Sequence, residues 1–286
     1  MKLFRNKRIK LLWDIFRLLL VFVVFYIIFI NINLTNLWDV LHQIQVWTVI
    51  LFLLCVFSLI FFQGFRWWLL IRAFTDKLSF IESMSIHFST LFYSLVLPNS
   101  TVQEVIRTVY VTKTTGYVIG WSSAWICKIM GVVVSLAFSA IGLLILPELP
   151  IPSIVYKIVF TLFILVCVTL LLSFTKKVSR PIRNLLLLYI PQSSLAWFEN
   201  LREGIYRFRD KKKALLFSLL ITILAQLMMF AGVAILLKGI TGKAYLIQVV
   251  AFIPLIEMIS MAQPLTPGGI GVREALVAVM FKHLNL

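Results

Sequence analysis

Apolar segments long enough to cross a lipid bilayer recur along the whole chain and limit its fold more than any other feature. A helix of about 20 apolar residues spans the roughly 30 Å hydrocarbon core of a membrane. Such segments are found at residues 11–32, 46–71, 117–146, 154–174 and 214–237. Because a bilayer offers the backbone no water, helices are the simplest way to satisfy its polar groups. The sequence therefore predicts an all-α, polytopic membrane protein.

Composition agrees with this prediction, since 61% of the residues are hydrophobic and only 13% are charged. The apolar segments leave no room for a separate soluble domain, so we expect residues 1–286 to form a single transmembrane domain. The N-terminus is basic like that of a signal peptide, but the apolar segment after it is too long and lacks a cleavage site. We therefore expect a first spanning helix at residues 11–32.

The net charge of +16 is better explained by membrane topology than by nucleic-acid binding. The Lys and Arg residues fall in particular short loops, as the positive-inside rule requires, and not along a groove with aromatic residues. Residues 175–213 carry ten of them, which predicts a basic cytoplasmic loop containing one or two interfacial helices. We expect a multi-pass protein of the inner or plasma membrane with a cytoplasmic N-terminus. Trp67 and Trp68 are expected to be interfacial anchors beside Arg66.

Two apolar segments are interrupted by residues that cannot continue a helix. Residues 263–274 contain two prolines and three glycines, and residues 97–107 contain Pro98 followed by a polar turn. Irregular backbone at membrane depth is tolerated where it is buried or lines a watery cavity. Paired discontinuous helices are typical of transport sites. We expect two re-entrant hairpins of opposite orientation, at residues 79–111 and 244–284, related as an inverted repeat.

These interrupted segments also carry a family resemblance. Residues 267–275, PGGIGVREA, resemble the signature of the lysylphosphatidylglycerol synthase transmembrane family, also called the flippase-like domain family. Leu97-Pro98 followed by Glu104-Val-Ile-Arg107 resembles an upstream pattern of the same family. The resemblance implies a bacterial or archaeal multi-pass protein that moves, or helps to process, a phosphate-bearing lipid. Gln103 stands where the family usually has Gly, and Lys128 lies in a helix that commonly carries an acidic residue.

Three basic residues are candidates for binding a lipid phosphate. Arginine is permanently charged and binds phosphate oxygens in a bidentate manner, and Arg107 and Arg273 each follow a helix break. Lys128 is also expected inside the membrane. The alternatives are structural: Arg107 extends to the cytoplasmic surface, while Arg273 pairs with Glu257 and Lys128 with an acid.

The acidic and glycine candidates have structural alternatives too. Glu104 answers a cationic headgroup or forms a capping box with Thr101, and Glu257 couples protons or pairs with a cation. Glu274 contacts the headgroup or neutralises the neighbouring Arg273. The three glycines of the break permit close approach of a headgroup or only a tight turn; they are Gly268, Gly269 and Gly271.

The sequence contains no recognisable catalytic motif, and we expect neither a metal nor another cofactor. The histidines lie apart from other ligand residues, and the three cysteines read as packing residues. The soluble aminoacyltransferase domain of fused family members is absent, so the resemblance implies no synthase activity. We expect a flippase whose partners are membrane lipids with anionic headgroups, together with a biosynthetic enzyme or a second copy of the chain. The alternatives are a membrane-embedded transferase or accessory subunit, and a non-transporting scaffold.

Overall fold

The computed structural model describes Tyr26 and residues 42–96, 101–146, 153–173, 192–262 and 271–283. Within these residues all regular secondary structure is helical, which confirms the predicted fold class. The expected first span, Pro98 and residues 263–270 of the second break lie outside the described residues.

Among the described residues, four helices are long and apolar enough to cross a membrane: α3 (Val46–Arg72), α6 (Tyr117–Ile145), α7 (Ser153–Ser173) and α10 (Lys212–Thr241). Each corresponds to a predicted span, although α10 is longer than predicted at both ends. The protein is therefore a multi-pass membrane protein.

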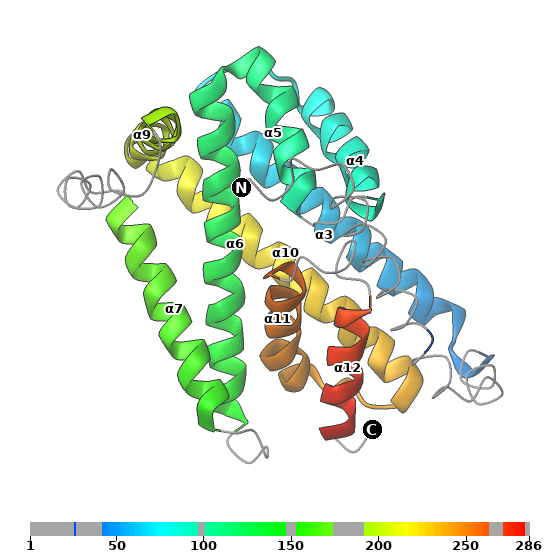
Figure 1. Cartoon of the computed structure of the whole chain (residues 1–286). Helices are drawn as coiled ribbons and strands as arrows, with labels where there is room; N and C mark the ends of the chain where they lie inside the picture. Colours follow the sequence, from blue (N-terminus) through cyan, green and yellow to red (C-terminus); the bar gives the residue numbers. More distant parts are fainter. Residues whose placement is uncertain are drawn as a thin grey trace.

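The remaining helices are shorter: α4 (Phe80–Val96), α5 (Thr101–Thr115), α9 (Gln192–Arg207), α11 (Leu246–Ala262) and α12 (Val272–His283). A 3₁₀ turn, η2 (Phe208–Asp210), lies between α9 and α10. In Figure 1 the α4–α5 pair lies at the end of the bundle near α9, and the α11–α12 pair lies towards the other end. Their re-entrant character and their relation as an inverted repeat stay predictions.

The antiparallel pair α3 and α10 forms the most extensive helix contact of the described bundle (Figure 1). At one end the ring of Phe74, just after α3, meets that of Phe208, just before α10, with centroids 4.6 Å apart. At the other end Gly239 of α10 lies against Thr48 of α3. The ends of these two helices therefore define the two faces of the molecule.

Apolar side chains form separate clusters towards these two faces. The first cluster, near α9, is centred on Trp67, Ile71 and Phe208 and includes Leu201 and Ile205 of α9. The second is built from buried residues of α10 and α11, namely Met229, Phe230, Leu237, Val249, Ile253 and Ile256. Because α9 buries its apolar face in the first cluster, this helix packs on the bundle as well as carrying charge.

The prediction that Trp67 is an interfacial anchor is wrong. Its side chain is fully buried, because α5 and α9 contribute residues to the cluster around it. Trp68 is only partly buried; it stacks with Phe65, and its Nε1 donates a hydrogen bond to the carbonyl oxygen of Leu78 at 3.3 Å.

Gly64 brings α4 close to α3. A Cβ atom at this position would lie 2.7 Å from Cδ2 of His87 and 2.9 Å from Sδ of Met84, distances that side chains do not normally adopt. The absence of a side chain on α3 therefore allows His87 of α4 to reach the middle of the bundle.

Candidate functional site

A polar cavity of about 380 Å³ lies in the middle of the bundle. Along α3, α6 and α10, most residues that line the cavity lie between the residues of the first apolar cluster and those of the second. Its charged lining residues are Arg66, Arg107, Lys128, Arg273, Glu104, Glu257 and Glu274, and its uncharged polar lining residues include Gln63, His87, Gln103, Ser135, Thr222 and Gln226. A polar layer at this depth is costly to maintain and marks a candidate functional site.

All six charged residues singled out in the sequence line this one cavity, although they come from four helices. They are Glu104 and Arg107 of α5, Lys128 of α6, Glu257 of α11, and Arg273 and Glu274 of α12. Gly271 directly precedes α12, whereas Gly268 and Gly269 lie outside the described residues. The structure thus brings Glu104 and Arg107, which follow the first predicted break, to the same cavity as Arg273 and Glu274, which follow the second.

Arg66, His87 and Gln226 also line the cavity, although the sequence patterns did not single them out as site residues. Arg66 resembles an interfacial residue, and an isolated histidine such as His87 only argues against a metal site. A helical pattern of polar residues was present, because Gln63 and Arg66 are three apart and Thr222 and Gln226 are four apart. This spacing places each pair on one face of an otherwise apolar helix.

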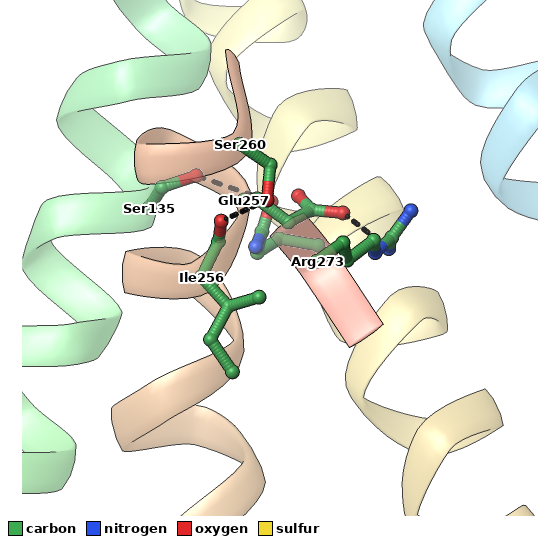
Figure 2. A network of polar contacts seen from close by, with 6 residues as sticks. Ser135, Ile256, Glu257, Ser260 and Arg273 are labelled. Atoms are coloured by element: carbon green, nitrogen blue, oxygen red, sulfur yellow. Dashed lines mark hydrogen bonds and ion pairs between the residues drawn. The ribbon is translucent and has the colours of Figure 1, made fainter. Parts of the chain in front are cut away.

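Two cations of the cavity form ion pairs with carboxylates. Arg273 Nη2 lies 3.0 Å from Glu257 Oε1, and Figure 2 shows these side chains extending towards each other from α12 and α11. Lys128 Nζ lies 3.6 Å from Glu104 Oε1, which connects α6 to α5. Both ion pairs correspond to structural alternatives considered for these residues.

Glu104 and Glu274 each stand near the start of a helix, and each has a described partner. Glu104 directs Oε1 towards Lys128, and its capping box with Thr101 stays a prediction because the Thr101 side chain is not described. Glu274 accepts a hydrogen bond from the Gly271 backbone N–H through Oε2, at 2.5 Å. With Gly271 at a φ of 88°, a conformation that glycine adopts readily, this contact caps the N-terminus of α12.

Arg107 is almost completely buried, with 4% of its surface exposed. Its Nη1 lies 3.1 Å from Nδ1 of His87, and its guanidinium carbon lies 4.4 Å from the ring centroid of Trp67. His87 Nε2 lies 3.1 Å from the carbonyl oxygen of Ile60. Because a carbonyl only accepts, we assign the proton to Nε2, which leaves Nδ1 of a neutral ring to accept from Arg107.

Arg66 extends from α3 to α10, where its Nη1 donates a hydrogen bond to Thr222 Oγ1 at 3.0 Å. Three buried nitrogen donors of cavity-lining side chains have no hydrogen-bond partner within the described structure: Nε of Arg66, Nε of Arg107 and Nε2 of Gln226. Buried donors usually have partners, so these atoms indicate an acceptor that the protein itself does not supply.

A second pocket, of about 250 Å³, adjoins the cavity. Glu104 and Lys128 line both spaces. The other residues of the second pocket are mainly apolar: Val105, Thr108, Trp121, Ala124, Trp125 and Leu201. A polar and an apolar compartment therefore meet at the Glu104–Lys128 ion pair.

The described residues contain no group of three or more His, Cys, Asp or Glu side chains able to hold a metal ion. The three cysteines are free thiols, and Cys127 is buried at the edge of the cavity.

Residues 15–286 match the model of a protein family described as Lysylphosphatidylglycerol synthase TM region. This match agrees with the resemblance carried by the PGGIGVREA segment. No curated protein and no solved structure matches the chain.

Proposed function

Because the chain belongs to the lysylphosphatidylglycerol synthase TM region family, whose name connects it with membrane lipids, we propose that it is a flippase for a phosphate-bearing lipid. The observation that carries this proposal is the mid-bundle cavity, lined by four basic and three acidic side chains among the described residues. With its carboxylates ionised, this set is net positive and complements a lipid phosphate.

The chemistry of the cavity suits the difficult step of lipid transfer. A phosphate that enters the membrane interior loses its hydration, at a cost of several kcal/mol that charged donors offset. Hydrogen bonds to charged groups contribute about 1.5–3 kcal/mol each. Arg107, Arg66 and Arg273 line the cavity and carry guanidinium donors suited to such bonds.

The apolar pocket beside the cavity favours an amphiphilic substrate over a soluble anion. A headgroup in the polar cavity would leave the lipid chain next to Trp121, Trp125 and Leu201. The Glu104–Lys128 ion pair would then lie at the junction between headgroup and chain. Phospholipids such as aminoacylated phosphatidylglycerol combine a charged headgroup with apolar chains, and so do polyprenyl-phosphate-linked molecules.

We place the protein in the inner or plasma membrane with its α9 end in the cytoplasm. The positive-inside rule supports this orientation, because the segment from α9 to the start of α10 is rich in Lys and Arg.

The test is a fluorescent-lipid translocation assay in liposomes that contain the purified protein. The lipids are phosphatidylglycerol, its aminoacylated form and a polyprenyl phosphate, each with and without a pH gradient. We expect translocation of at least one lipid, abolished in the double variant R107Q/R273Q and retained in R72Q/R209Q, whose two arginines lie outside the cavity. Extracted lipid should be chemically unchanged. Translocation that survives R107Q/R273Q, or modification of the headgroup in place of movement, would contradict the proposal.

A further inference from the structure

The four basic residues of the cavity differ in how their charges are compensated. Lys128 and Arg273 each form an ion pair with a carboxylate, supplied by Glu104 and Glu257. In the described part of the chain no carboxylate pairs with Arg66 or Arg107. Their side-chain hydrogen bonds go to neutral partners, the Thr222 hydroxyl and the His87 ring.

Arg107 is buried and Arg66 is half-buried with an inaccessible Nε, and guanidinium groups without an ion-pair partner are costly inside a membrane domain. A buried charge that lacks an oppositely charged partner destabilises the folded protein. The two arginines also repel each other. Because both line the same cavity and both have an unpartnered Nε, the missing negative charge is best supplied by a ligand.

We propose that Arg66 and Arg107, together with the Gln226 amide, form the subsite that binds the substrate's phosphate oxyanion, while His87 positions Arg107. This assignment rests on the proposed function and narrows its binding site to three helices, α3, α5 and α10. Arg273 and Lys128 then serve mainly in their ion pairs with α11 and α5. Two of the three ligand residues, Arg66 and Gln226, are not part of either motif that carries the family resemblance.

The nature of the donors points to phosphate. Guanidinium groups bind the oxygens of a phosphate in a bidentate manner, and a neutral amide adds a donor without a further charge. His87 supports this arrangement because its Nδ1 occupies one Arg107 N–H, so that the remaining donors of Arg107 are restricted in orientation. The cation–π contact with Trp67 holds the same guanidinium from its face.

The assignment can be tested by ligand binding without any transport. Thermal unfolding of the purified protein in a neutral detergent is measured against three probes: inorganic phosphate, dihexanoyl phosphatidylglycerol and uncharged dihexanoylglycerol. A ligand that binds the folded state raises Tm, and the concentration dependence gives its Kd. We expect stabilisation by the phosphatidylglycerol and none by the dihexanoylglycerol.

Single substitutions distinguish the proposed phosphate ligands, Arg66 and Arg107, from the ion-paired cations, Lys128 and Arg273. We expect R66Q and R107Q to weaken phosphatidylglycerol binding by about 10- to 100-fold, as for loss of a charged hydrogen bond. K128Q and R273Q should weaken it less, and the exposed R72Q should leave it unchanged. R66K and R107K, which keep the charge but lose the bidentate geometry, should be intermediate. Equal losses in all four cavity variants, or wild-type binding by R66Q and R107Q, would overturn the assignment.

A second readout keeps the test decisive if a variant folds poorly. Removing an uncompensated charge should leave the ligand-free Tm unchanged or raised in R107Q, whereas a purely structural arginine would lower it. If the binding pattern holds but liposomes show no lipid movement, the subsite stands and the flippase proposal fails. Inorganic phosphate that binds as tightly as the lipid would support the oxyanion subsite and contradict a lipid substrate.

Discussion

Arg107 of α5 and His87 of α4 are joined by a 3.1 Å contact between Nη1 and Nδ1, and this contact fixes the direction of a buried charge. The Ile60 carbonyl on α3 determines which His87 nitrogen carries the proton. Three consecutive helices thus cooperate to present one guanidinium to the cavity. Because each ring nitrogen of His87 has a partner within the protein, its burial is explained without a bound metal.

Substitution of His87 tests this positioning role. In H87L the acceptor for Arg107 is lost, and we expect binding of dihexanoyl phosphatidylglycerol to weaken by about 3- to 10-fold, the effect of one ordinary hydrogen bond. H87N offers an amide oxygen near the Nδ1 position and should recover most of the affinity. Binding is measured by ligand-dependent Tm. If leucine and asparagine behave alike, His87 only fills space.

Alanine substitutions at Gly64 and Gly131 provide a test and a control for the close approach of α4 to α3. G64A places a methyl group 2.7 Å from His87 Cδ2, so we expect a loss of about 1–3 kcal/mol in stability and weaker phosphate-lipid binding. In G131A the nearest side-chain atom is Arg66 Nη1 at 3.8 Å, which leaves room for the methyl group. Because alanine favours a helix by about 0.5–1 kcal/mol over glycine, G131A should not lower stability. Thermal unfolding in detergent measures both; a G64A protein as stable as wild type would show that α4 can shift freely.

Much of the helix pattern could be predicted from the sequence, since spans such as α3 and α6 are long apolar segments bounded by polar residues. The charged residues at the two breaks could be found because a charge beside an interrupted apolar segment stands out locally. Their meeting in one cavity could not be predicted in the same way. Arg107 and Arg273 are brought together by the tertiary packing of α5 and α12 around the bundle, which no local pattern contains.

The partners of the charged side chains were harder to predict from the sequence than the presence of these residues at the site. Arg66 resembles an interfacial anchor because two tryptophans follow it, and only the packing of α5 and α9 over Trp67 places it inside. Glu274 stands next to Arg273, so the sequence suggested that it neutralises this neighbour and did not suggest a capping role. Glu274 caps α12 by accepting from the Gly271 N–H, and Oε1 of Glu104 lies near the Lys128 ammonium.

The Glu257–Arg273 ion pair should couple α11 to α12. Among the contacts drawn in Figure 2 it is the one that crosses between these two helices. Since about half of the Arg273 side chain is exposed, we expect a coupling energy of about 0.5–1 kcal/mol in a double-mutant cycle of E257Q and R273Q. The measurement is thermal unfolding of the two single variants and the double variant. Additive effects would mean that the pair contributes nothing beyond its separate side chains.

The orientation of the bundle can be tested by cysteine labelling from either side of the membrane. In a background with Cys55, Cys127 and Cys167 replaced, D76C and K243C are the informative positions, because both residues are exposed. Asp76 lies in the segment after α3, close to the start of α10, and Lys243 follows the far end of α10.

At about 1.5 Å per residue the 30 residues of α10 extend about 45 Å, more than the thickness of the hydrocarbon core. We therefore expect a membrane-impermeant maleimide added outside intact cells to label K243C and not D76C. Permeabilised cells should allow labelling of both, which controls for reactivity. D210C should behave as D76C does, since Asp210 belongs to η2, whose Phe208 contacts Phe74. Labelling of D76C or D210C from outside would reverse the orientation and place the basic loop outside the cytoplasm, against the positive-inside rule.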